Sequence, residues 1–284
     1  MTSWNLYFKR NPVVVVIYNW ILNIKCSMVE NYIFVATTGR SGTDSLTNIF
    51  KAADKAVSLH EPHPIMLQDI PPSQNPVSVF KKQFNTLKRI YIKRAAAGHR
   101  YYVETNHQFI KTFAIPAAAE LGSKLKVIHL VRDTIKVALS FYSIDSIPGA
   151  TERGKLYLLD PFQRDNILYL PDLFKDGAEF NHPLYRCLWY WYEVEARISR
   201  FKEQFPHVPI YKIQTHELND AHKLSEMFEV LGVDFNPLAL RELVGTRTNL
   251  KSQEKKKVLD TDGVAEMNDR LLSVLSDRFD MNFL

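Results

Sequence analysis

Short hydrophobic runs alternate with longer amphipathic stretches along most of the chain. The hydrophobic runs cover residues 31–37, 100–105, 124–131 and 208–214. Patterns typical of helices follow at 44–54, 134–143, 184–205 and 222–232. A parallel strand is buried on both faces and leads into a crossover helix, so this alternation predicts an α/β fold in three layers around a central parallel sheet.

Two regions interrupt this rhythm. Residues 62–78 are rich in proline, and residues 145–183 carry scattered glycine, proline, aspartate and aromatic residues. Long loops in compact domains often serve function, so we expect both regions to cap a substrate site. No linker divides the rest of the chain, which predicts one domain over residues 31–284 and an extension over residues 1–30.

The extension contains an apolar run at residues 11–24. The run is short for a membrane span, which needs roughly 20 residues, and it contains Asn19. No small-residue cleavage site follows, and the first predicted strand begins only a few residues later. We expect a core strand or a peripheral extension here, with membrane attachment as the minority alternative.

Composition narrows the function only partly. Of the 284 residues, 46% are hydrophobic, the net charge is +5 and the pI is about 9.0, which suits a globular protein with an anionic ligand. No dense Lys/Arg tract indicates a nucleic-acid partner. The two cysteines, Cys26 and Cys187, make no disulfide framework and no zinc motif, which favours a reducing, cytoplasmic location without a metal. The sequence does not indicate an oligomeric state.

The first predicted strand runs into a loop suited to an anion, "TTGRSGTDS" at 37–45. A strand, a glycine turn and a helix start present free backbone N–H groups, and Arg40 adds a guanidinium fork that matches phosphate or sulfate. The loop differs from the triphosphate motif GxxxxGK[ST], because Thr43 stands where a lysine is expected. A kinase that uses ATP or GTP is therefore disfavoured.

A second candidate follows the third predicted strand. Arg132 leaves that strand, and Ser140 comes eight residues later, about two turns into a helix. Alone, Arg132 and Asp133 could form an ion pair or a helix cap. Beside the first loop, an arginine at the same sheet edge indicates one ligand with two separated anionic groups.

Both segments resemble motifs of PAPS-dependent sulfotransferases. "TTGRSGTDSL" is similar to their 5'-phosphosulfate loop, and "LVRDTIKVALSFYS" is similar to their 3'-phosphate motif. The resemblance implies a P-loop-like phosphosulfate-binding loop, PAPS (3'-phosphoadenosine-5'-phosphosulfate) as co-substrate and no metal. The implied cofactor-binding residues are Thr38, Gly39, Arg40, Ser41, Gly42, Thr43, Asp44, Ser45, Arg132, Ser140 and Arg247.

Two differences from the cytosolic branch of that family indicate which branch the chain resembles more. Arg40 stands where the cytosolic branch has lysine, so the chain looks nearer the carbohydrate-type and bacterial branches. The C-terminal R-K-G-x-x-G-D motif of the cytosolic branch is absent, and Arg247 is the candidate to replace it at the 3'-phosphate.

Transfer to a hydroxyl requires a general base, for which there are two candidates. Glu61, in "LHEPHP", is similar to the Glu-Pro element of carbohydrate and bacterial sulfotransferases and is our first choice. His107, in "VETNHQF", lies near the catalytic histidine of the cytosolic branch, one position out of register. A surface carboxylate and a helix-capping histidine are the plain alternatives. Arg40 is the third catalytic candidate, stabilising charge on the leaving phosphate.

The acceptor cannot be read from the sequence. A carbohydrate or another small molecule fits, and Tyr142, Tyr157, Phe162 and Tyr169 could pack against it or form a loop core. His60 and His63 flank Glu61 but make weak evidence for a metal. The remaining alternatives are a divergent P-loop kinase and a sulfotransferase-like module that binds a nucleotide without turnover.

Overall fold

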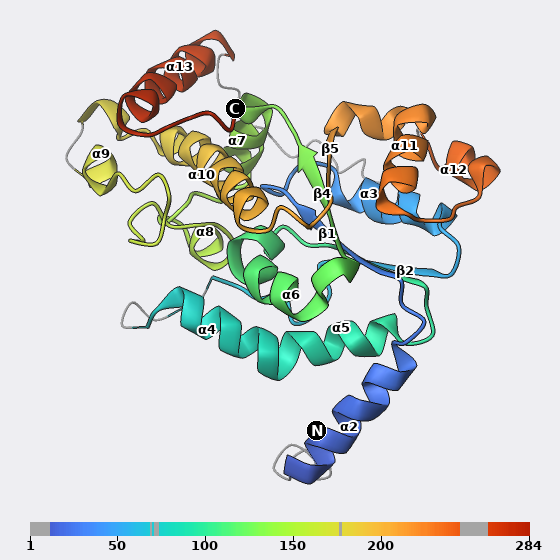
Figure 1. Cartoon of the computed structure of the whole chain (residues 1–284). Coiled ribbons are helices and arrows are strands. Elements are labelled where there is room, and N and C mark those ends of the chain that lie inside the picture. Colours follow the sequence, from blue (N-terminus) through green and yellow to red (C-terminus); the bar gives the residue numbers. More distant parts are fainter. Residues whose placement is uncertain (1–11, 69, 71–73, 176–177, 245–260) are drawn as a thin grey trace.

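The sheet confirms the predicted α/β architecture. The computed structural model describes residues 12–68, 70, 74–175, 178–244 and 261–284 (Figure 1). Five parallel strands lie in the order β2-β3-β1-β4-β5. Their bounds are β1 (Asn31–Ala36), β2 (Ala56–His60), β3 (Tyr101–Thr105), β4 (Leu125–Val131) and β5 (Ile210–Gln214). The central β1 pairs with both β3 and β4, so the connections change direction at β1.

Helices cover both faces of the sheet (Figure 1). One face packs against α3 (Thr43–Ile49), α11 (Ala221–Leu231) and α12 (Pro237–Leu243). The other packs against α5 (Arg89–Ala96), α6 (Ala114–Leu121), α7 (Thr134–Ser143), α10 (Pro183–Gln204) and α13 (Thr261–Arg278). Successive side chains of a strand point to opposite faces, so Ile33 and Val35 enter one core while Tyr32 and Phe34 enter the other.

Four strands and four helical segments lie close to where the hydrophobic pattern predicts them. Gly232 ends α11 in the left-handed conformation, with φ 64°, as a helix-terminating glycine does. Trp189, Tyr190 and Tyr192 of α10 are buried, as expected for core residues. The edge strand β2 was not predicted; its side chains are only partly buried, and so they give no clear alternation.

The predicted loops are partly helical. In the first, the described residues up to Asn75 form no helix or strand, but α4 (Pro76–Gln83) begins inside the predicted loop and continues through a short π-helix, η2 (Phe84–Lys88), into α5. The second contains α8 (Glu152–Tyr157), α9 (Pro171–Lys175) and a 3-10 turn, η5 (Ala178–Phe180). Thr151 caps α8 by accepting a hydrogen bond from the Gly154 N–H at 3.1 Å.

The apolar N-terminal run is a helix, and the expectation of a core strand was wrong. Helix α2 (Pro12–Lys25) projects from the body beside α5 (Figure 1). A helix satisfies its own backbone hydrogen bonds and so needs no place in the sheet. None of the helices described is long and apolar enough to cross a membrane.

Candidate active site

A cavity of about 720 Å³ lies at the carboxyl edge of the sheet, where the connections reverse around β1. Ligands of open α/β sheets bind at such reversal points. Loops after all five strands contribute to the wall. The lining residues are Gly39, Arg40, Gly42, Thr43, Asp44, Ser45, His60, Glu61, His107, Arg132, Phe141, Ile144, Ser146, Arg153, Tyr157 and Thr215.

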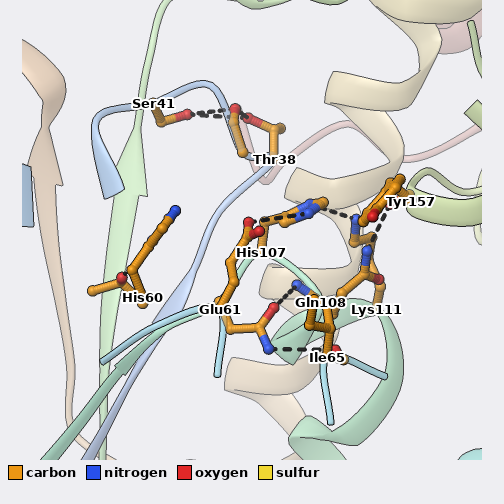
Figure 2. Close-up of polar contacts among 12 residues, drawn as sticks. Thr38, Ser41, His60, Glu61, Ile65, His107, Gln108, Lys111 and Tyr157 are labelled. Carbon is orange, nitrogen blue, oxygen red and sulfur yellow. Dashed lines mark hydrogen bonds and ion pairs between the residues drawn. The ribbon is translucent and has the colours of Figure 1, made fainter. Parts of the chain in front are cut away.

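The loop after β1 is held in shape by its own hydroxyl groups. Ser41 is fully buried, and its hydroxyl donates to the Gly39 carbonyl at 3.0 Å and lies 3.2 Å from the Thr38 hydroxyl (Figure 2). Thr38 and Ser41 therefore shape the loop and do not line the cavity. Gly39 has φ 85°, and a Cβ there would lie 3.2 Å from the ring of His107. Arg40 also adopts a positive φ of 58°, a conformation that is uncommon for non-glycine residues.

Three arginines converge on this cavity. Arg40 donates from Nε to the Ser140 hydroxyl at 2.8 Å, and Arg132 donates from Nη1 to the Arg40 carbonyl. Arg153 of α8 is the third. None of the three forms an ion pair with a carboxylate in the part of the chain that the structure describes. Burial, and next the charges of Arg132 and Arg153, lower the pKa of Arg40, so the cluster would be stabilised by an anion.

The two predicted anion-binding segments are tied to one helix. The Tyr190 hydroxyl of α10 donates to the Thr38 carbonyl at 2.8 Å. The adjacent Trp191 indole donates to the Arg132 carbonyl at 2.9 Å. Thr215, just after β5, adds a third tie, from its hydroxyl to the Ser41 carbonyl at 2.8 Å. The positions of both segments are thus set by rigid elements.

The two candidate bases contact each other. Glu61 Oε1 lies 3.3 Å from His107 Nε2 (Figure 2). Glu61 follows β2 and His107 follows β3, and these strands pair with His60 opposite Thr105. Their neighbouring carboxyl ends bring the two side chains together. The Glu61 side chain is 29% exposed and that of His107 only 9%, so the carboxylate is the more accessible to a substrate.

Behind His107 lies a buried lysine that the sequence analysis missed. Lys111 Nζ is 2.9 Å from His107 Nδ1, and it donates to the Tyr157 carbonyl at 2.6 Å and to the Tyr190 hydroxyl at 3.0 Å (Figure 2). Burial, and next the charge of Lys111, hold the pKa of His107 well below its ordinary range. Burial also lowers the pKa of Lys111 strongly. The imidazole is therefore neutral at neutral pH.

A buried ion pair supports the Glu61 loop from below. Lys88 Nζ lies 2.7 Å from Glu104 Oε1, and the side chains are 1% and 0% exposed. Glu104 also accepts from the Tyr102 hydroxyl at 2.6 Å and from the Asn106 amide at 2.9 Å. Lys88 in turn donates to the carbonyl of Pro62, next to Glu61, at 3.2 Å.

Most of the predicted site residues come together. Gly39, Arg40, Gly42, Thr43, Asp44, Ser45, Arg132, Glu61 and His107 line the cavity. Ser140 contacts Arg40 and does not reach the wall, and Arg247 lies outside the described residues. Of the four aromatic residues considered for the acceptor, Tyr157 alone lines the cavity.

Arg153 and Thr215 also line the cavity, although the sequence singled out neither of them. His60 lines the cavity but contacts Asp44 at 2.9 Å and the Thr105 hydroxyl at 3.0 Å. The described residues contain no group of three or more His, Cys, Asp or Glu side chains placed to hold a metal ion.

Comparison with known proteins finds similarity at the level of structure. No protein-family model and no curated protein matches the chain. A sulfotransferase domain from the curacin biosynthetic pathway is 15% identical, with a TM-score of 0.48 over 87% of this chain and 98% of that one. The sulfotransferase from Alicyclobacillus acidocaldarius is 16% identical, with a TM-score of 0.44 over 89% and 98%. Mouse sulfotransferase SULT7A1 complexed with PAP is 16% identical, with a TM-score of 0.45 over 88% and 86%.

Proposed function

We propose that the protein transfers a sulfuryl group from PAPS to a hydroxyl group of a carbohydrate or another small molecule, giving PAP and a sulfate ester. One observation carries this proposal. Three arginines that form no ion pair with any carboxylate among the described residues meet a carboxylate–imidazole pair in one cavity. The arginines suit a ligand with several anionic groups, and the pair suits removal of a proton from an acceptor.

The residues present fit PAPS. Arg40 and the loop after β1 would hold the 5'-phosphosulfate, and Arg132 would hold the 3'-phosphate. The loop also packs closely on the ring of His107, since a Cβ at residue 39 would lie 3.2 Å from it and would require the ring to shift slightly. When bound, PAPS supplies the sulfuryl group, whose bond to the 5'-phosphate oxygen breaks as the acceptor oxygen bonds to sulfur. Arg40 would stabilise the charge that develops on the leaving phosphate.

Glu61 is the base that the geometry favours. Both side chains line the cavity, but Glu61 is the more exposed, and burial holds the pKa of His107 well below its ordinary range, which weakens the imidazole as a proton acceptor. A neutral imidazole can donate from Nε2 to the carboxylate and orient it, while Nδ1 accepts from Lys111 at 2.9 Å. Glu61 would then take the acceptor hydroxyl proton as the oxygen attacks.

Calorimetric titration with PAP, and separately with ATP plus magnesium, tests the donor. We expect PAP to bind without added metal and more tightly than ATP. Arg40→Ala and Arg132→Ala should each weaken PAP binding at least tenfold, because a charge-assisted hydrogen bond contributes about 1.5–3 kcal/mol. Arg241→Ala, which removes an arginine of α12 outside the cavity, should change nothing.

The same titrations separate the rival functions. Preference for ATP with magnesium would replace this proposal with a divergent P-loop kinase. PAP binding without sulfation of any acceptor, tested with radiolabelled PAPS and a panel of sugars and alcohols, would favour a nucleotide-binding module without turnover. Unchanged PAP affinity in both cavity variants would refute the assignment of the two loops.

A further inference from the structure

The surface formed by α2 and the outer side of α4–α5, which we call the α2/α5 face, is apolar and basic. Helix α2 is apolar on two sides. Leu22 of the helix is buried against the body, as are Cys26 and Val29 in the segment that follows it. The opposite side carries large apolar side chains that are 39–67% exposed: Val16, Ile17, Trp20, Ile21, Ile24 and, in the turn after the helix, Met28.

Helix α5 continues this surface. The Arg94 guanidinium lies 5.0 Å from the centre of the Tyr18 ring and 6.0 Å from that of Tyr91, which joins the two helices. Tyr91, Leu87 and Val77 are exposed along α4–α5. The face therefore extends from α2 onto α5, and α4 carries further exposed apolar side chains along the same helical rod.

The charge of this face has one sign. Residues 12–29 and 76–97 contain seven lysines and arginines and no aspartate or glutamate. The seven are Lys25, Lys81, Lys82, Lys88, Arg89, Lys93 and Arg94. Lys88 is buried, and Glu120 pairs with Arg89 and Lys93. Lys25, Lys81, Lys82 and Arg94 remain exposed and form no ion pair with a described carboxylate.

We propose that the α2/α5 face binds the surface of an anionic lipid bilayer, with α2 lying along the interface. An exposed apolar helix face with a tryptophan and a basic surround is typical of interfacial helices. Exposed lysines and arginines add attraction to anionic headgroups. The 14 residues of α2 extend about 21 Å, less than the roughly 30 Å of a hydrocarbon core, so the helix lies on the bilayer.

Charge argues against a second copy of the chain as the occupant. A symmetric dimer brings the same surface of both copies together, which would oppose these basic residues to one another. The α2/α5 face also leaves the cavity open. Helix α2 leads into the amino end of β1, whereas the cavity lies at the carboxyl edge of the sheet.

Co-sedimentation with phosphatidylcholine vesicles, with and without 30% phosphatidylserine, tests the proposal. The full chain should bind the anionic vesicles, and Ile17→Ser with Trp20→Ser should weaken binding by about tenfold or more. The matched control, Val230→Ser with Leu238→Ser, removes two equally exposed apolar side chains from α11 and α12 and should bind as the wild type does. Lys81→Gln with Lys82→Gln should weaken binding by about fivefold per charge and reduce its salt dependence.

Three results would overturn the proposal. One is no binding to anionic vesicles. Another is equal binding to neutral and anionic vesicles. The third is a concentration-dependent dimer in sedimentation equilibrium, without lipid, that Ile17→Ser with Trp20→Ser abolishes. Circular dichroism and thermal unfolding of every variant show that it is folded, independently of ligand binding.

Discussion

Lys88→Met tests whether the buried ion pair holds the Glu61 loop. The change leaves Glu104 fully buried without its cationic partner, and it removes the donor to the Pro62 carbonyl. Breaking a buried pair from one side costs about 3–5 kcal/mol of the free energy of unfolding. For a chain of this size that corresponds to a fall in Tm of roughly 10 °C.

Urea unfolding followed by circular dichroism measures this loss. Lys82→Met, an exposed lysine a short distance along the chain, is the matched control and should stay within about 0.5 kcal/mol of wild type. Lys88→Met with Glu104→Gln should lose less than Lys88→Met alone. A glutamine carries no charge. Its amide oxygen can still accept from Asn106 in place of Oε1, and its NH2, in place of Oε2, can donate to the Tyr102 hydroxyl oxygen.

Catalysis gives a second readout. Folded Lys88→Met protein should bind PAP with near-normal affinity and turn over more slowly, because the loop carrying Glu61 loses an anchor. If Lys88→Met lowers the free energy of unfolding by less than about 1 kcal/mol, another group must compensate the buried charge of Glu104. The ion pair with Lys88 would then not be what holds the Glu61 loop.

Three further changes test the site. Glu61→Gln should leave PAP affinity unchanged and cut turnover about a hundredfold or more; if His107→Ala does this and Glu61→Gln does not, the base is misassigned. Burial lowers the pKa of Lys111 in the folded protein. Between that pKa and about 10.5, the unfolded chain carries one more proton than the folded chain, so the free energy of unfolding rises with pH by at most about 1.4 kcal/mol per pH unit. Lys111→Met should remove this slope, measured by denaturation at pH 7 to 10. Gly39→Ala should lower the free energy of unfolding by about 1–2 kcal/mol, because residue 39 has a left-handed backbone, and should also slow turnover by displacing His107. Gly98→Ala, with φ 82° and open space around it, should show only the backbone cost. Equal turnover in the two variants would count against close packing of residue 39 on His107.

Much of the fold could be predicted from sequence because its strands are buried on both faces. Continuous apolar runs at β1 and β4 mark a central parallel sheet, and Gly232 marks the end of α11. The edge strand β2 gives no such signal, since its residues are half-exposed. The sequence predicted a strand at helix α2 because a run of β-branched residues favours a strand locally. The position of this segment outside the sheet depends on the whole fold and has no local signal.

Some residues of the candidate site could likewise be predicted from the sequence, and others could not. Residues of the two loops are contiguous in sequence, so a motif can show them. The contact between Glu61 and His107 depends on β2 lying next to β3, which the sequence analysis did not include. From the sequence alone, Glu61 and His107 are therefore alternatives for one role. Arg153 reaches the cavity from α8, a short helix in a region without hydrophobic periodicity, and Lys111 is a buried lysine that no local pattern marks.

Tyr190 and Trp191 are neighbours on one helix, and each fixes a different anion-binding segment. The Thr38 and Arg132 carbonyls are thereby held by one rigid helix, in addition to the direct hydrogen bond from Arg132 to the Arg40 carbonyl. A tilt of α10 would move these two carbonyls together and preserve the distance between them. We therefore expect the cavity to select ligands by the spacing of their anionic groups as well as by their total charge.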